Sequence, residues 1–252
     1  MDLGIKGRVA LVLGASRGIG RAIAERLAEE GAHVALTSRS EERLATVVAM
    51  IGAERARAFP ADTGDLERMA ALPTEVAREL GPVDILVLNT GGPPRGTAFE
   101  HGIEAAEEAY RSLVLAPRVL IEAVLPGMRE RGWGRIVNVA SSSVREPIPG
   151  LALSNSNRMA AVGLLNTIAR EVGADGVTVN TIATGRFATD RLAEGYGGSL
   201  EEAQRVARDE VPAARLGMPE EFGDLVAFVC SDRAGYLTGT VIPLDGGLTR
   251  SS

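Results

Sequence analysis

The chain has 252 residues, of which 45% are hydrophobic, so it can bury a sizeable core. Its net charge of -6 offers no basic face for a phosphate backbone and excludes nucleic acid as an expected partner. No apolar run is long enough to span a bilayer, the N-terminus does not resemble a signal peptide, and the single cysteine, Cys230, excludes an internal disulfide. These features favour a cytoplasmic protein with no membrane partner.

Short apolar runs rich in β-branched residues alternate with segments of helical periodicity. Strands that are apolar nearly throughout are buried on both faces, as in a parallel sheet covered by helices. The predicted strands lie at residues 8–14, 33–39, 83–89, 134–141 and 177–185, with a short last strand within 237–247. The pattern predicts an α/β fold, in which a single domain over 1–252 contains a Rossmann-type, doubly wound parallel sheet with helices on both faces.

The first predicted strand runs into LGASRGIGRAIAERL, which contains Gly14, Gly18 and Gly20. A glycine-rich turn between a strand and a helix places backbone N–H groups and the positive end of the helix dipole beside a diphosphate. Glycine is required because a side chain would block either that approach or the packing of the helix on the strand. The segment therefore predicts a dinucleotide-binding loop.

Ser38 and Arg39 stand at the end of the second predicted strand, where NAD-binding proteins of this fold tend to carry an acidic residue. A carboxylate there would repel a ribose 2'-phosphate, whereas an arginine can bind it in a bidentate manner. Arg17, inside the glycine loop, would add a second positive charge. We therefore expect NADP(H) as the cofactor; the alternative is that both arginines are ordinary solvated side chains.

Residues 186–218 depart from the strand and helix alternation, with a glycine-rich break between two amphipathic pieces. A long excursion after the carboxyl end of a strand lies where open α/β sheets bind ligands. We interpret this segment as a lid over the site, with a surface helical hairpin as the alternative.

Several ordered motifs carry a family resemblance: GASRGIG at 14–20, Ala61-Asp62, NTGG at 89–92, GRIVNVASS at 134–142, VTVNTIATG at 177–185, Thr189-Asp190 and LDGG at 244–247. With these motifs the chain resembles a short-chain dehydrogenase/reductase along essentially its whole length. It is most similar to the β-ketoacyl-(acyl-carrier-protein) reductase-like members. The resemblance implies a small-molecule substrate and a homodimer or homotetramer.

The resemblance also implies roles for individual residues. Asp62 would contact the adenine side of the cofactor, Asn89 would stabilise the central strand and its turn, and Thr189 would face the nicotinamide amide. Ser141 matches the serine that hydrogen-bonds the substrate carbonyl. The implied cofactor site comprises Gly14, Ser16, Arg17, Gly18, Ile19, Gly20, Ser38, Arg39, Asp62, Asn89, Gly91, Arg158, Gly185 and Thr189.

The chain departs from the family at its catalytic positions. The family's Tyr-x-x-x-Lys motif is replaced by Ser154 and Arg158, and the position of the family's helix asparagine is Leu113. Serine is a far weaker acid than tyrosine, and arginine does not release its proton in proteins. Lys6 is the only lysine, and none of the three tyrosines is followed by a lysine four positions later. The family's proton relay therefore cannot operate here.

Three functions remain open from the sequence. The first is an NADP(H)-dependent oxidoreductase for a carbonyl or hydroxyl substrate, including 3-oxoacyl thioesters, in which Ser141, Ser154 and Arg158 are the catalytic residues and hold water as the proton donor. The second is a nucleotide-binding protein without dehydrogenase activity, acting as a sensor or partner subunit. The third, a halohydrin dehalogenase, is disfavoured by the intact glycine loop and the missing tyrosine. His33 and His101 have no neighbours at metal-ligand spacing, so no metal is expected.

Overall fold

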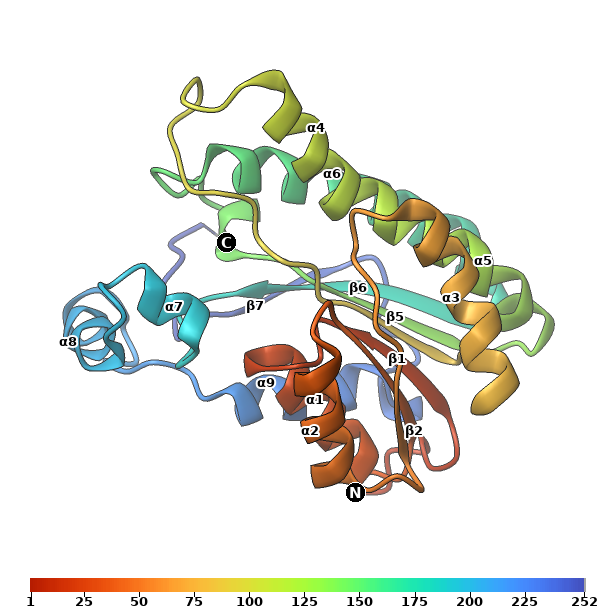
Figure 1. Ribbon diagram of the computed structural model, residues 1–252. Helices are drawn as coiled ribbons and strands as arrows, with labels where there is room; N and C mark the ends of the chain where they lie inside the picture. The colour runs from red at the N-terminus through yellow and green to blue at the C-terminus, as the bar shows by residue number, and fades with distance from the viewer. Residues whose placement is uncertain (252) are drawn as a thin grey trace.

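The structure, a computed structural model, describes residues 1–251 and has a seven-stranded parallel sheet at its centre (Figure 1). The strands are β1 (Val9–Leu13), β2 (His33–Thr37), β3 (Ala56–Ala58), β4 (Ile85–Leu88), β5 (Gly134–Val139), β6 (Val177–Thr184) and β7 (Val241–Leu244). Their spatial order is β3-β2-β1-β4-β5-β6-β7, and every neighbouring pair is parallel. This arrangement confirms the predicted Rossmann-type fold.

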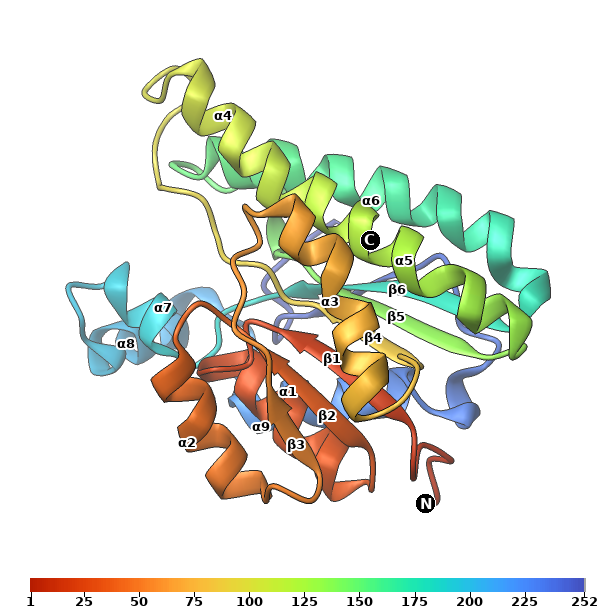
Figure 2. The ribbon, with the colours of Figure 1, turned by 45° about the vertical axis from the view of Figure 1, so that its right-hand side comes forward.

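Helices cover both faces of the sheet (Figures 1 and 2). One face carries α1 (Gly18–Glu29), α2 (Glu41–Ile51) and α9 (Pro219–Val229). The other carries α3 (Leu66–Glu79), α4 (Ile103–Tyr110), α5 (Ala116–Glu130) and α6 (Ala152–Val172). The short helices α7 (Asp190–Glu194) and α8 (Leu200–Glu210) lie apart from these layers, beyond one end of the sheet. The 3-10 turns are η2 (Ser142–Val144), η3 (Gly173–Asp175) and η4 (Asp232–Ala234), and η1 (Arg111–Leu115) is a π-helical turn.

The apolar strands form because their side chains are buried on both faces. In β1, Ala10 and Val12 pack into the core beneath α1 and α9, whereas Val9, Leu11 and Leu13 pack into the core beneath α3 and α5. Successive side chains of a strand point to opposite faces, so two buried faces require an uninterrupted apolar run. The uninterrupted apolar sequences of the strands therefore reflect burial on both faces of the sheet.

The order of the strands reverses between β1 and β4. β1 pairs with β2 on one side and with β4 on the other, so the connections leave this point in opposite directions. Ligands of open α/β sheets bind in the crevice at such a reversal, beyond the carboxyl ends of the strands. The glycine loop follows β1 and Asn89 follows β4, so both lie at this crevice.

The segment 186–218 is ordered around a small core of its own. Ala203, Ala207, Val211 and Leu216 are buried together, and the partly buried Tyr196 packs against them. At the base, the backbone N–H of Ala188 donates to the carbonyl of Gly217 over 2.9 Å, and that of Gly217 donates to Arg186 over 2.9 Å. These backbone bonds close the two ends of the segment on one another.

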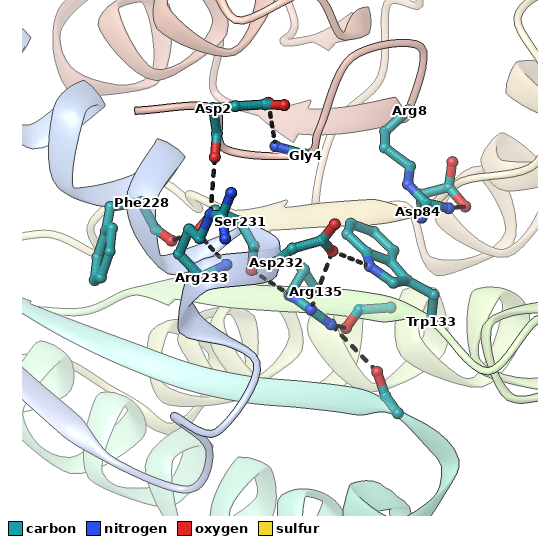
Figure 3. Close-up of polar contacts among 12 residues, drawn as sticks. Asp2, Gly4, Arg8, Asp84, Trp133, Arg135, Phe228, Ser231, Asp232 and Arg233 are labelled. Carbon is teal, nitrogen blue, oxygen red and sulfur yellow. Dashed lines mark hydrogen bonds and ion pairs between the residues drawn. The ribbon is translucent and has the colours of Figure 1, made fainter.

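Arg135 lies at the amino-terminal edge of the sheet, opposite the crevice, within a polar network (Figure 3). Its guanidinium donates to the carbonyls of Ser231, Gly134 and Gly176 over 2.9 to 3.2 Å, and it lies 3.8 Å from the carboxylate of Asp232. It also stacks on the ring of Trp133, 4.4 Å from the centroid. Burial lowers the pKa of Arg135, against the opposing effect of Asp232. The network joins β5 to the segment that follows α9.

We predict that Arg135→Met lowers the free energy of unfolding by about 2 to 3 kcal/mol, because the guanidinium's acceptors lose their donor inside the fold. Urea denaturation monitored by circular dichroism measures the change. The control is Arg208→Met, which removes an exposed arginine of α8 and should change stability by no more than about 0.5 kcal/mol. Equal midpoints for Arg135→Met and the wild type would show that the network is not stabilising.

Candidate functional site

One cleft of about 690 Å³ lies beyond the carboxyl ends of the strands and gathers every site residue that the sequence predicted. Its lining includes Gly14, Ser16, Arg17, Gly18, Ile19, Gly20, Ser38, Arg39, Asp62, Asn89, Gly91, Ser141, Ser154, Arg158, Gly185 and Thr189. These residues come from the segments that follow β1 to β6 and from the starts of α1 and α6. Parallel pairing places the carboxyl ends of all these strands at one edge of the sheet, which explains the convergence.

The glycine loop brings α1 against the end of β1 with no space for side chains. A Cβ atom on Gly20 would collide with the carbonyl oxygen of Gly14 and with the side-chain amide of Asn89. Gly14 has a φ of +61°, and a Cβ there would lie 2.6 Å from the Asn89 carbonyl. The amide of Asn89 donates to the carbonyl of Gly14 over 3.5 Å. The first turn of α1 is thereby held with its N–H groups at the cleft.

The end of the cleft beyond β2 carries the residues expected to bind the ribose and its 2'-phosphate. Arg39 is 82% exposed and lies 4.0 Å from the carboxylate of Asp62, a weak surface contact that leaves its guanidinium accessible. The hydroxyl of Ser40 caps α2 by accepting from the N–H of Arg43 over 3.4 Å. Arg43 also lines the cleft, a position that the sequence analysis missed. The sequence did contain a clue to Arg43: it follows Arg39 by four residues, in the first turn of the helix that begins just after Arg39.

Ser141, Ser154 and Arg158 come together at the end of β5. Ser154 and Arg158 are one helical turn apart on α6 and are bonded to each other, with Arg158 Nε donating to Ser154 Oγ over 3.2 Å. Arg158 Nη1 also donates to the carbonyl of Val139, the last residue of β5, over 2.9 Å. Ser141 Oγ accepts from the N–H of Ser143 over 3.1 Å. Both serine oxygens therefore accept a bond within the protein and keep their O–H groups as donors.

Arg158 places a positive charge inside the cleft. Burial, together with the nearby positive charge of Arg191, lowers its pKa to about 10. The group is still protonated at neutral pH because the shifted value lies well above 7. It acts as a fixed cation that donates hydrogen bonds and does not exchange its proton.

The turn after β6 holds Thr184, Gly185 and Thr189. A Cβ atom on Gly185 would collide with the backbone of Asp245, so this turn lies tightly against the end of β7. Thr189 caps α7 by accepting from the N–H of Leu192 over 3.2 Å, and it lines the cleft as well. Thr184 Oγ1 is buried in the cleft lining with no hydrogen-bond partner among residues 1–251.

Other cleft residues were not foreseen. They are Arg43, Thr63, Gly64, Thr90, Arg95, Glu108, Ser112, Leu151 and Arg191, among others. From the segment 186–218, Phe187 and Leu192 line the cleft, whereas Tyr196 does not. Tyr196 instead packs against the small core of the segment 186–218, because that core needs an apolar cover.

The π-helical turn η1 occupies the position of the family's helix asparagine. It turns Leu113 into an apolar cluster with Val114 and Ala161, where Leu113 is 3% exposed. The neighbouring Ser112 lines the cleft, and its hydroxyl donates to the carbonyl of Ala109 over 3.3 Å. Leu113 itself offers no polar group for a proton relay.

The residues of the cleft fit a nicotinamide dinucleotide. The glycine cradle, which a Cβ on Gly14 or Gly20 would fill, leaves the start of α1 accessible to a diphosphate. Arg39 and Arg43 provide guanidinium groups at the part of the cleft beyond β2, whereas the guanidinium of Arg17 lies 3.5 Å from the carboxylate of Asp190 on α7. The hydrogen-bond donors of the cleft and the close packing of backbone at the glycine loop both agree with the dinucleotide-binding motif.

Within residues 1–251, no group of three or more histidine, cysteine, aspartate and glutamate side chains is arranged to hold a metal ion. In the same range, none of the helices combines the length and the apolar character that crossing a membrane requires.

Comparison with known proteins identifies relatives over nearly the whole chain. A family model described as enoyl-(acyl carrier protein) reductase matches residues 14–249. The 3-oxoacyl-(acyl-carrier-protein) reductase FabG of Vibrio cholerae is 36% identical over 247 residues, which cover 98% of this chain and 99% of that protein. The cyclohexanol dehydrogenase of Rhodococcus sp. is 34% identical over 272 residues and 99% of both chains.

A solved structure agrees in both sequence and fold. L-sorbose reductase from Gluconobacter frateurii, complexed with NADPH and L-sorbose, is 33% identical and superposes with a TM-score of 0.93 over 100% of both chains. The fold, the ordered motifs and these relatives lead to one conclusion: the chain belongs to the short-chain dehydrogenase/reductase family of oxidoreductases.

Proposed function

We propose that the protein is an NADP(H)-dependent oxidoreductase that acts on a carbonyl or hydroxyl compound with a proton donor other than tyrosine. One observation carries the proposal: a single cleft joins the glycine loop to the cluster of Ser141, Ser154 and Arg158. A dinucleotide on the loop and a substrate at the cluster would share that cleft.

The preference for the phosphorylated cofactor rests on the charges at the end of β2. Arg39 and Arg43 are accessible there, and no acidic residue takes the position that would hold an unmodified ribose. Asp62 would contact the adenine side, and Arg17, in the glycine loop, would add a second positive charge. The NADPH complex of the related L-sorbose reductase supports the same choice.

The cluster would bind a carbonyl oxygen through three donors. A bound nicotinamide cofactor would supply or accept the hydride. The free O–H groups of Ser141 and Ser154 would donate to the oxygen, and the guanidinium of Arg158 would stabilise its negative charge as the bond order falls. Because Arg158 keeps its proton, the proton that completes the alcohol would come from water held at the two serines.

The relatives define the substrate class only broadly. FabG is named for 3-oxoacyl-(acyl-carrier-protein), and the sorbose reductase structure holds L-sorbose. Both compounds carry a carbonyl group, so a ketone, including a 3-oxoacyl thioester, fits the proposal. The segment 186–218, with Phe187 and Leu192 on the cleft, would act as a lid. The proposal also includes a cytoplasmic location, and the family resemblance implies a homodimer or homotetramer.

A second candidate function is nucleotide binding without dehydrogenase activity. The observation that favours it is the joint replacement of three family residues, at Leu113, Ser154 and Arg158, in an otherwise intact cleft. A protein of this kind would bind the dinucleotide as a sensor or as a partner subunit.

We expect Arg39→Ala and Arg43→Ala to weaken NADPH binding by roughly tenfold each and to leave NADH binding unchanged, because each variant removes a charge-assisted contact to the 2'-phosphate. Fluorescence titration of both nucleotides measures this selectivity. Arg208→Ala, at an exposed position of α8, is the matched control. Equal effects on NADPH and NADH would refute the assignment of NADP(H).

Ser141→Ala and Ser154→Ala should each lower kcat by roughly a hundredfold, as expected when one donor to a developing oxyanion is removed. The NADPH dissociation constant of Ser141→Ala should stay at its wild-type value. Ser156→Ala, at an exposed position of α6 between Ser154 and Arg158 in the sequence, serves as the control. If purified protein binds NADPH and still fails to oxidise it across a broad screen of ketones and 3-oxoacyl thioesters, the oxidoreductase proposal is wrong.

The double variant Ser154→Tyr with Arg158→Lys distinguishes the two candidate functions. Under the binding-only function, the wild type has no activity and the double variant gains it, since the tyrosine and lysine supply the missing proton relay. Under the oxidoreductase function, the wild type is already active. Steady-state NADPH oxidation with one ketone substrate measures both proteins.

A further inference from the structure

Three arginines line the end of the cleft between α6 and α7, where the substrate would lie. Arg158 is on α6, Arg95 is on the loop after β4, and Arg191 is on α7. We refer to these residues as the arginine triad. The carboxylates that line the same end are Glu108 and Asp190. The protein as a whole carries a net charge of -6, so an excess of positive charge here is a local feature.

Arg95 and Arg191 reach across the mouth of the cleft in opposite directions. Arg95 extends toward α7, where its Nη2 would lie 2.6 Å from a Cβ on Gly195. Arg191 extends back toward the β4 loop, where its Nη2 would lie 2.8 Å from a Cβ on Gly92 and donates to the carbonyl of Pro93 over 3.4 Å. The two glycines leave the space that the guanidinium groups occupy.

The loop that carries Arg95 is held in place. Pro93 and Pro94 restrict the backbone just before it. The N–H of Gly96 donates to the carbonyl of Gly150 over 2.8 Å, and the N–H of Ala152 donates to Gly96 over 3.2 Å. These hydrogen bonds join the loop to the start of α6. The elements that carry Arg95 and Arg158 are therefore in direct contact.

Of the arginine triad, only Arg191 is paired with a carboxylate within residues 1–251. Asp190 and Glu194 pair with Arg17 at 3.5 and 3.6 Å, and Glu194 also lies 3.3 Å from Arg191 on the exposed side of α7. No ion pair joins Arg95 or Arg158 to a carboxylate within residues 1–251. Burial and the like charge of Arg191 both lower the pKa of Arg158. A partly buried cation of this kind is stabilised when an anion binds beside it.

We propose that the arginine triad selects an anionic substrate, a carbonyl or hydroxyl compound that carries a carboxylate or phosphate group. The proposal rests on the proposed oxidoreductase function and adds the substrate class to it. Arg95 and Arg191 bind the acid group at the mouth, while the carbonyl lies between Ser141 and Ser154, with Arg158 between the two groups. Guanidinium groups bind both kinds of acid in a bidentate manner, so the shared chemistry is an oxyanion.

Calorimetric titration with matched probes tests the proposal on purified protein, with and without saturating NADP. The pairs are 4-oxopentanoate and 4-oxopentanamide, 2-oxobutanoate and 2-oxobutanamide, and dihydroxyacetone phosphate and dihydroxyacetone. The charged member of at least one pair should bind tenfold or more tightly than its neutral partner. Whether an oxo acid or the phosphate ester shows the larger ratio identifies the acid group.

Arg95→Gln and Arg191→Gln should each reduce that ratio by roughly tenfold, the effect of losing one charge-assisted contact. Arg208→Gln, on α8 and outside the cleft lining, is the matched control, and an unchanged thermal midpoint shows that each variant folds. The proposal is overturned if no charged probe binds more tightly than its neutral partner, or if the two cleft variants change the ratio no more than Arg208→Gln does. A protein that binds no dinucleotide but keeps the charge ratio would contradict the oxidoreductase function alone, because the triad belongs to the chain itself.

Discussion

The close approach of α1 to the carboxyl end of β1 is the constraint on which the cleft depends. Gly20 lies against the carbonyl of Gly14, and the amide of Asn89 closes the same contact from β4, so no side chain fits between helix and strand. Because β1 and β4 are neighbours at the reversal of strand order, this contact also sets the opening between the two halves of the sheet. The remaining site residues reach the cleft through the parallel register of β2, β5 and β6.

The cleft is rich in positively charged side chains, although the whole protein has a net negative charge. The acidic chain concentrates six arginines in one lining, Arg17, Arg39, Arg43, Arg95, Arg158 and Arg191. Arg158 occupies the position where the family has a lysine, and it bonds to Ser154 and to the end of β5. Its lowered pKa of about 10 still leaves it a cation at neutral pH. The consequence is a site that stabilises negative charge through fixed donors instead of passing a proton along side chains.

Some features of the fold and site escaped the sequence for identifiable reasons. β3 is three residues long and contains the exposed Arg57, so it has neither the length nor the apolar pattern of the other strands. Because Tyr196 is flanked by glycines, the sequence predicts a mobile side chain on the surface. Its partial burial follows only from the small core of the segment 186–218. Arg95 and Arg191 lie in polar stretches in which any arginine has solvent as its default surroundings.

The sequence by itself determined the sheet, the glycine loop and the family motifs, because apolar runs and glycine turns express local geometry that neighbouring residues specify. It also showed the loss of the family's tyrosine and lysine. Only the tertiary structure decided that Arg158 bonds to Val139, 19 positions away, and that Arg95 crosses to Gly195. Such contacts depend on which elements pack together, and side chains distant in the chain share a site only after the sheet has aligned the ends of its strands.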